Sequence, residues 1–157
     1  MASYIKWIRS KVGHQKIILN FSAGILSDNA NAILLQKRSD ENKWGLPGGA
    51  LEVGESAYGA LKREFKEETG LNIQPSKLLG MYSKYFDSYP NGDTAQTVTS
   101  LFEVGLKSGK QEYSIDSSET LDLRFFSRDK ILQIKIVNQQ HKDMINDFFE
   151  QYYPIDR

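Results

Sequence analysis

The pattern of apolar and polar positions predicts several strands with one central and one terminal helix. Residues 16–26 and 32–36 are rich in Ile, Leu and Phe, and the polar residues 27–31 between them indicate a turn, so these segments form a candidate strand pair. Three further segments have strand character and are separated by polar or glycine-containing connections: residues 71–85, 97–104 and 120–126. This order of elements favours an α/β fold in which helices cover a mixed sheet.

The helices are predicted from caps and from apolar stripes. The central helix runs from Ser56, a suitable N-cap, to Thr69, and Gly70 is a natural C-terminal stop. The terminal helix spans residues 137–153, where one stripe is apolar: Met144, Ile145, Phe148, Phe149 and Tyr152. Residues 1–14 predict a shorter N-terminal helical extension that either caps the core or meets a partner. Since no linker or repeat divides the chain, we expect one domain over residues 1–157.

Composition narrows the class of protein. Twenty Lys and Arg residues balance twenty Asp and Glu residues, so no global charge favours a nucleic-acid polymer or a membrane as partner, and a small-molecule substrate is favoured. The absence of cysteine removes disulfides, thiolate nucleophiles and cysteine-based zinc sites. No segment approaches the roughly 20 apolar residues of a membrane span, and the first residues lack the apolar core of a signal peptide. We therefore expect a cytoplasmic protein.

The central helix breaks the usual amphipathic pattern. At 3.6 residues per turn, three carboxylates share the side that carries the apolar residues: Glu64, Glu67 and Glu68. Lys62 and Lys66 occupy the opposite side, so no cation is expected beside the acids. Because these carboxylates repel one another and their burial is costly, a hard divalent cation such as Mg²⁺ is the expected partner. The alternative is a solvated helix in which Arg63 pairs with Glu67.

A glycine-rich bend precedes this helix. Residues 44–49, Trp-Gly-Leu-Pro-Gly-Gly, contain too much Gly and Pro for the interior of a regular element. A bend with so few side chains can bring backbone carbonyls to a metal or backbone N–H groups to a phosphate. Taken alone, the bend is equally well interpreted as a plain turn.

Bend and helix together resemble a family signature, the Nudix box. Every fixed position is filled at its required spacing: Gly49, five residues, Glu55, seven residues, Arg63-Glu64, Phe65, Lys66, Glu67-Glu68, Thr69, Gly70 and Leu71. The preceding strand and residues 44–48 also resemble the usual entry to the box. The resemblance implies the Nudix fold, an α/β/α sandwich around a mixed β-sheet that occupies nearly the whole chain.

The resemblance also implies an activity and a cofactor. Family members hydrolyse a phosphoanhydride bond in a nucleoside diphosphate linked to another group, such as a nucleoside triphosphate, dinucleoside polyphosphate or nucleotide sugar. They use Mg²⁺, or Mn²⁺ in its place. Glu64 and Glu68 match the principal metal ligands, Glu67 an additional ligand, and a backbone carbonyl near Gly48 another. Arg63 is expected to hold a glutamate by a charge-assisted hydrogen bond.

Other residues are assigned less directly. Glu55 would support the loop of the box. The general base is either a box glutamate or a carboxylate from a distant loop, and Glu119 occupies a place where relatives supply such a carboxylate; an exposed loop acid is the alternative. Arg38 is a candidate for contacting substrate phosphates, with a solvated basic residue as the alternative. Tyr85 and Tyr89 are candidates for stacking on a nucleobase, although strand alternation places about half of the neighbouring aromatic residues in the core.

Two other functions are compatible with the sequence. The same fold can serve as a non-catalytic nucleotide-sensing or regulatory module, but such a module need not keep every catalytic acid. Removal of phosphates from capped RNA is a weaker enzymatic alternative, because it needs a basic surface for the RNA chain. A homodimer is compatible with the sheet edges and the N-terminal segment. For both histidines, His14 and His141, a surface or structural role is expected.

Overall fold

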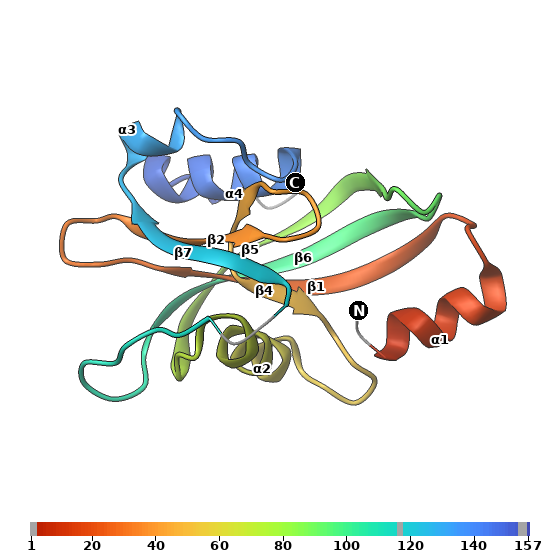
Figure 1. Ribbon diagram of the computed structural model, residues 1–157, viewed down its shortest axis with the longest axis horizontal. Helices are drawn as coiled ribbons and strands as arrows, with labels where there is room; N and C mark the ends of the chain where they lie inside the picture. The colour runs from red at the N-terminus through yellow and green to blue at the C-terminus, as the bar shows by residue number, and fades with distance from the viewer. Residues whose placement is uncertain (1–2, 116–117, 154–156) are drawn as a thin grey trace.

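The strands form two sheets in the computed structural model, which describes residues 3–115, 118–153 and 157 (Figure 1). The larger sheet has the order β4 (Gly48–Ala50), β1 (Ile17–Leu26), β6 (Thr94–Leu106) and β5 (Ile73–Ser88). The smaller sheet has the order β3 (Trp44–Gly45), β2 (Ile33–Arg38) and β7 (Thr120–Phe126). The helices of the described residues are α1 (Ser3–Val12), α2 (Ala57–Thr69), α3 (Arg128–Ile131) and α4 (Gln139–Glu150).

Strand β1 lies inside the larger sheet and makes it mixed. It runs parallel to β6 over its full length, whereas β4 pairs with it in the antiparallel sense. The expected pairing of residues 16–26 with residues 32–36 is wrong, because β6 and β4 already occupy both edges of β1. Strand β2 belongs to the other sheet, and an isolated bridge between Ser27 and Ile33 joins the two segments.

Two apolar cores lie on opposite faces of the strand layer. Met144 and Ile145 of α4 belong to one core, and Leu61 and Phe65 of α2 belong to the other. Figure 1 shows α2 and α4 on opposite sides of the strands. The molecule is therefore the predicted sandwich of helices around mixed β-structure.

Most of the predicted elements agree with the structure, and the differences lie in strand and helix limits, in residues 44–49 and in one short helix. Helix α2 has the expected limits, since the Ser56 hydroxyl accepts a hydrogen bond from the Gly59 N–H and Gly70 adopts a left-handed conformation with φ 76°. Strands β5 and β6 are longer than predicted, and the terminal helix is shorter. Residues 44–49 are not all irregular, because β3 and β4 pair there with β2 and β1. The short helix α3 was not predicted.

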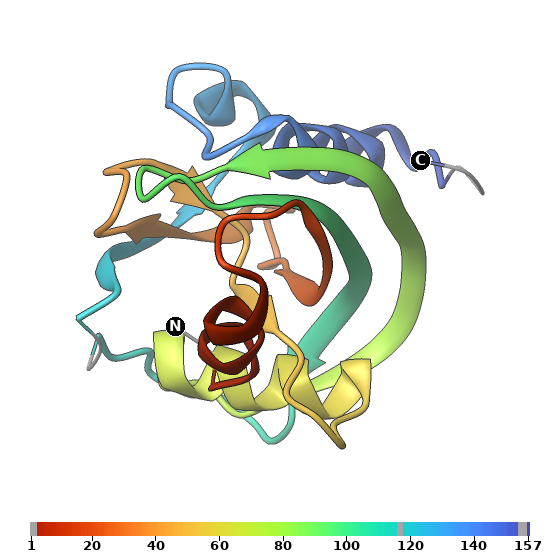
Figure 2. The same ribbon diagram turned by 90° about the vertical axis from the view of Figure 1, so that its right-hand side faces the viewer.

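Helix α1 confirms the helical pattern near the N-terminus; residues 1 and 2 of the predicted extension lie outside the described residues. None of the ten residues of this helix is fully buried, so α1 is attached to the surface rather than inserted into a core. Figure 2 shows it on the inner side of the curve formed by β5 and β6. Among the described residues, no helix has both the length and the apolar character needed to cross a bilayer.

Candidate active site

The packing of α2 turns two of its carboxylates inward. Leu61 and Phe65 are completely buried, and Glu68 on the same side is only 4% exposed. The side chain of Glu64 is 13% exposed, whereas that of Glu67 is 59% exposed. The expectation that three glutamates share the apolar side is thus wrong for Glu67, which lies at the border of the buried side.

Glu68 is a buried carboxylate with one oxygen unpartnered. Its Oε1 accepts a hydrogen bond of 3.3 Å from the Gly48 N–H, while its Oε2 is buried and has no hydrogen-bond partner. Burial raises the pKa of Glu68 well above its usual range, and repulsion from Glu64 adds to this effect. A carboxylate in this state lacks a compensating positive charge.

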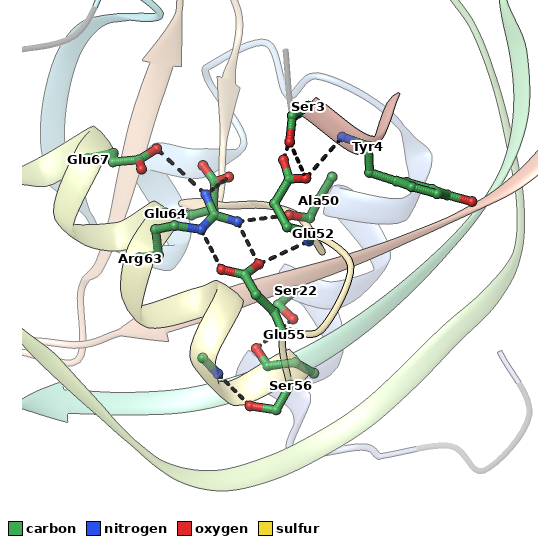
Figure 3. Close-up of polar contacts among 12 residues, drawn as sticks. Ser3, Tyr4, Ser22, Ala50, Glu52, Glu55, Ser56, Arg63, Glu64 and Glu67 are labelled. Atoms are coloured by element: carbon green, nitrogen blue, oxygen red, sulfur yellow. Dashed lines mark hydrogen bonds and ion pairs between the residues drawn. The ribbon is translucent and has the colours of Figure 1, made fainter. Parts of the chain in front are cut away.

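Arg63 is the centre of the polar network shown in Figure 3. Its Nε and Nη2 donate to the two carboxylate oxygens of Glu55 at 2.7 and 2.8 Å. Its Nη1 donates to Glu64 Oε1 at 2.6 Å and lies 3.7 Å from Glu67 Oε2. Its Nη2 also donates to the carbonyl of Ala50. The expectation that no cation lies beside the acids is therefore wrong, because the Arg63 guanidinium reaches the inward side of α2.

Arg63 and burial shift the pKa of these carboxyl groups in opposite directions. Hydrogen bonds from Arg63 lower the pKa of Glu55 to about 2, so Glu55 is ionised at any working pH. Burial raises the pKa of Glu64, and the hydrogen bond from Arg63 opposes that rise. Arg63 therefore keeps a largely buried carboxylate oriented and closer to its ionised form.

Two glycines let the bend approach these carboxylates. At Gly48, where φ is +153°, a β-carbon would lie 2.1 Å from the carbonyl oxygen of Ser22. At Gly49, a β-carbon would lie 2.3 Å from Glu64 Cδ. The structure shows the Gly48 N–H directed to Glu68, so the bend already contacts the acids through its backbone. A metal-binding role for the carbonyl near Gly48 stays a prediction.

Glu119 joins the box glutamates at one cavity. This cavity of about 580 Å³ is lined by Glu119 together with Glu64, Glu67 and Glu68. Burial is the main cause of the raised pKa of Glu64 and Glu68, and the charge of Glu119 adds to it in both. Glu119, directly before β7, therefore lines the same cavity as the box glutamates, and its catalytic role stays a prediction.

A larger cleft of about 1080 Å³ continues from the same carboxylates and contains two of the three predicted substrate-binding residues. Arg38 and Tyr89 line it, and the Arg38 guanidinium is paired with Asp40. Tyr85 is not among the lining residues: its hydroxyl donates to Asp143 of α4 at 2.6 Å. The assignment of Tyr85 to the substrate is therefore corrected, because the side chain packs against α4 instead.

His141 is a cleft residue that the sequence did not single out. Its Nδ1 accepts a hydrogen bond of 3.0 Å from the Leu46 N–H, and the ring lines the cleft. Burial lowers the pKa of His141 to about 3, so the ring is neutral and its proton is on Nε2. The hydrogen bond to Leu46 is consistent with the expected structural role, but the sequence did not indicate that His141 lines the cleft.

The carboxylate end of the cleft fits a divalent cation. The unpartnered Oε2 of Glu68 and the nearby carboxylates of Glu64 and Glu119 form a set of hard oxygen donors. No three His, Asp or Glu side chains among the described residues are arranged to hold a metal by themselves. Mg²⁺ commonly takes one or two carboxylates and completes its shell with water and substrate phosphates, so this sparse set is suitable.

Comparison with known proteins identifies the family of this chain. The family model described as the NUDIX domain matches residues 19–148. The chain therefore belongs to the NUDIX family and is a Nudix hydrolase, an enzyme that acts on nucleotide pyrophosphate bonds.

Similar proteins carry different substrate names. The chain is 34% identical over 124 residues to the "Putative 8-oxo-dGTP diphosphatase" of Bacillus subtilis, covering 79% of this chain and 75% of the relative. It is 34% identical over 127 residues to the "ADP-ribose pyrophosphatase" of Methanocaldococcus jannaschii, covering 80% and 69%. The MutT protein from Methanosarcina mazei Go1 has the same fold, with a TM-score of 0.72 and 21% identity over 89% of this chain and 99% of that one.

Proposed function

We propose that this Nudix hydrolase is Mg²⁺-dependent and cleaves a phosphoanhydride bond in a nucleoside diphosphate linked to another group. The observation that carries the proposal is the buried, unpartnered Oε2 of Glu68 beside Glu64, at one end of a cleft large enough for a nucleotide. Nucleoside triphosphates, dinucleoside polyphosphates and nucleotide sugars all contain such a bond. The relatives named for 8-oxo-dGTP and ADP-ribose support this range without selecting within it.

The residues at the carboxylate end of the cleft have distinct proposed roles. Glu64, Glu68 and a backbone carbonyl near Gly48 would hold Mg²⁺ or Mn²⁺, with Glu67 as a further ligand. When bound, the metal would neutralise charge on phosphoryl oxygens and lower the pKa of a coordinated water. Arg63 orients Glu64 through the contact of 2.6 Å.

Two acids are candidates for the general base. Glu67 is largely exposed to the cavity, and Glu119 reaches the same cavity from the residue before β7. Either could accept a proton from the attacking water without first leaving a buried environment. Arg38 and Tyr89 line the same cleft and would contact phosphate and base, respectively.

Product release from a panel of these substrates, with Mg²⁺, with Mn²⁺ and with chelator, tests the proposal. Glu68→Gln should remain folded and lose at least about 100-fold in kcat, because a neutral amide replaces a charged ligand. Glu112→Gln is the matched control, since Glu112 is exposed and lines neither cavity. Full activity of folded Glu68→Gln would overturn the assignment. Nucleotide binding without any turnover would instead favour the non-catalytic sensing module.

A further inference from the structure

Helix α1 lies outside the residues that define the family but forms one side of the cleft. It ends at Val12, whereas the NUDIX match begins at residue 19. Ser3, Ile5 and Arg9 of this helix line the cleft together with residues of β1. No residue of α1 is completely buried, and polar contacts hold it at both ends.

Glu52 holds the N-terminal end of α1. Its Oε1 accepts from the Ser3 N–H at 2.7 Å, and its Oε2 accepts from the Ser3 hydroxyl at 2.6 Å and the Tyr4 N–H at 2.9 Å (Figure 3). A carboxylate at the start of a helix satisfies free N–H groups and interacts favourably with the helix dipole. Glu52 occupies a position that the Nudix box leaves free.

Arg9 holds the other end of α1. Its guanidinium donates to the carbonyls of Gly13, Gln15 and Thr94, and its Nε lies 3.5 Å from Asp93 Oδ2. The Arg9 side chain is only 9% exposed. The helix is thus fixed between the loop of the box and the start of β6.

The contact at Glu52 continues into the network around Arg63. The backbone N–H of Glu52 donates to Glu55 Oε2 at 3.0 Å. Glu55 in turn binds Arg63, and Arg63 binds Glu64. One loop residue therefore joins α1 to the carboxylate that would hold the metal.

We propose that α1 is a substrate-binding wall of the cleft, in which Ile5 packs against the nucleobase and Glu52 is the residue that positions the helix. Ile5, Leu19 and Phe21 together give the cleft an apolar surface beside its many polar groups. A flat aromatic base is the part of a nucleotide that gains most from such a surface. The proposal rests on the proposed function in one respect, namely that the bound ligand is a nucleotide.

Ile5→Ala and Ile8→Ala form a matched pair that tests the wall. Both residues are partly buried on the same helix, but only Ile5 lines the cleft. Calorimetric titration with ADP, GDP and inorganic pyrophosphate in the presence of Mg²⁺ measures binding without turnover. Ile5→Ala should weaken ADP and GDP roughly 5–10-fold and leave pyrophosphate unchanged, whereas Ile8→Ala should change none of them. Equal effects of the two substitutions, or an equal loss for pyrophosphate, would overturn the role of Ile5.

Because these titrations need no hydrolysis, they test the proposed role of α1 independently of the proposed activity. If hydrolysis fails while Ile5→Ala alone weakens nucleotide binding, the proposed function is wrong and the wall stands. If hydrolysis is found while Ile5→Ala binds ADP and GDP as tightly as the unmodified protein, the wall is wrong and the activity stands.

Glu52→Gln tests the positioning residue, with Glu112→Gln as the control for loss of one negative charge. Hydrogen–deuterium exchange of residues 3–12 should become roughly 10-fold faster in Glu52→Gln, because an amide cannot accept all three hydrogen bonds. KM for the substrate turned over should rise more than kcat falls, with the melting temperature unchanged because α1 contributes no buried residue. Unchanged exchange, or faster exchange with unchanged KM, would overturn the role of Glu52.

Discussion

Gly49 lies so close to Glu64 that any side chain at residue 49 would displace the carboxylate: a β-carbon there would stand 2.3 Å from Glu64 Cδ. Gly49 cannot retreat, because it pairs with Ser22 in the sheet. We expect Gly49→Ala to fold and to lose about 100-fold or more in kcat. The control is Gly105→Ala, since a β-carbon at Gly105 meets no atom within 4 Å. Steady-state kinetics of both variants test this prediction. Equal kcat values would show that the position of Glu64 does not affect catalysis.

Glu68 should destabilise the protein when metal is removed. Its pKa is raised in the folded state by burial, so stability is full below the unfolded value near 4.5 and is lost as pH rises above it. In chelator at pH 7.5, Glu68→Gln should melt a few degrees higher than the unmodified protein, about 1–2 kcal/mol. This difference should vanish near pH 4.5. Thermal melts across pH measure it, and a lower melting temperature for Glu68→Gln would contradict the unpaired state of the carboxylate.

Arg63→Lys tests whether the role of Arg63 depends on its positive charge or on the planar geometry of its guanidinium group. A lysine keeps the positive charge but cannot bind Glu55 and Glu64 at once with a planar fork. We expect kcat to fall about 10- to 100-fold, with weaker activation by Mg²⁺ and an intact fold. Arg124→Lys is the matched control, because Arg124 forms an exposed pair with Asp122. Activity is measured for both variants as a function of Mg²⁺ concentration. Equal kcat and equal activation by Mg²⁺ in the two variants would refute this account.

His141 should remain neutral across the working pH range. Its folded pKa of about 3 lies below the unfolded value near 6.5, so its contribution to stability is full above pH 6.5 and is lost as pH falls toward 3. His141→Leu should lower stability by about 1 kcal/mol at pH 8, since the Leu46 N–H loses its acceptor. Between pH 6.5 and pH 4, the variant should also lose less stability than the unmodified protein does. NMR titration of the ring checks the pKa directly, and a midpoint near 6.5 would be inconsistent with burial.

The parts of the fold that local chemistry specifies were predictable. The Ser56 cap, the Gly70 stop and the apolar repeat of α2 each act within a few residues, and α2 has the limits they imply. The pairing of β1 was not predictable from its neighbours in the sequence, because its partners are residues 48–50 and 95–104. Strand pairing depends on which edges remain free in the assembled sheet, and apolar alternation does not encode that.

The candidate site was predictable where spacing along a helix controls it. Glu64 and Glu68 turn inward as expected, and Glu119 reaches them from far along the chain. The assignment of Tyr85 to the cleft failed because β5 has a register shift between Tyr82 and Tyr85, which alternation alone does not reveal. The roles of Glu52 and His141 depend on contacts across 48 and 95 residues, so no local pattern indicates them.

The parallel pairing of β1 with β6 also sets an order of assembly. Ile17 faces Ala95 and Leu26 faces Val104, so one edge of β1 has no partner on the ribosome until most of the chain has been synthesised. Contact of Phe21 with Ala50 across β1 and β4 can form much earlier and brings the loop of the box against β1. Because long-range pairing is slow and an open apolar edge promotes aggregation, chaperone assistance during translation is most valuable before β6 emerges.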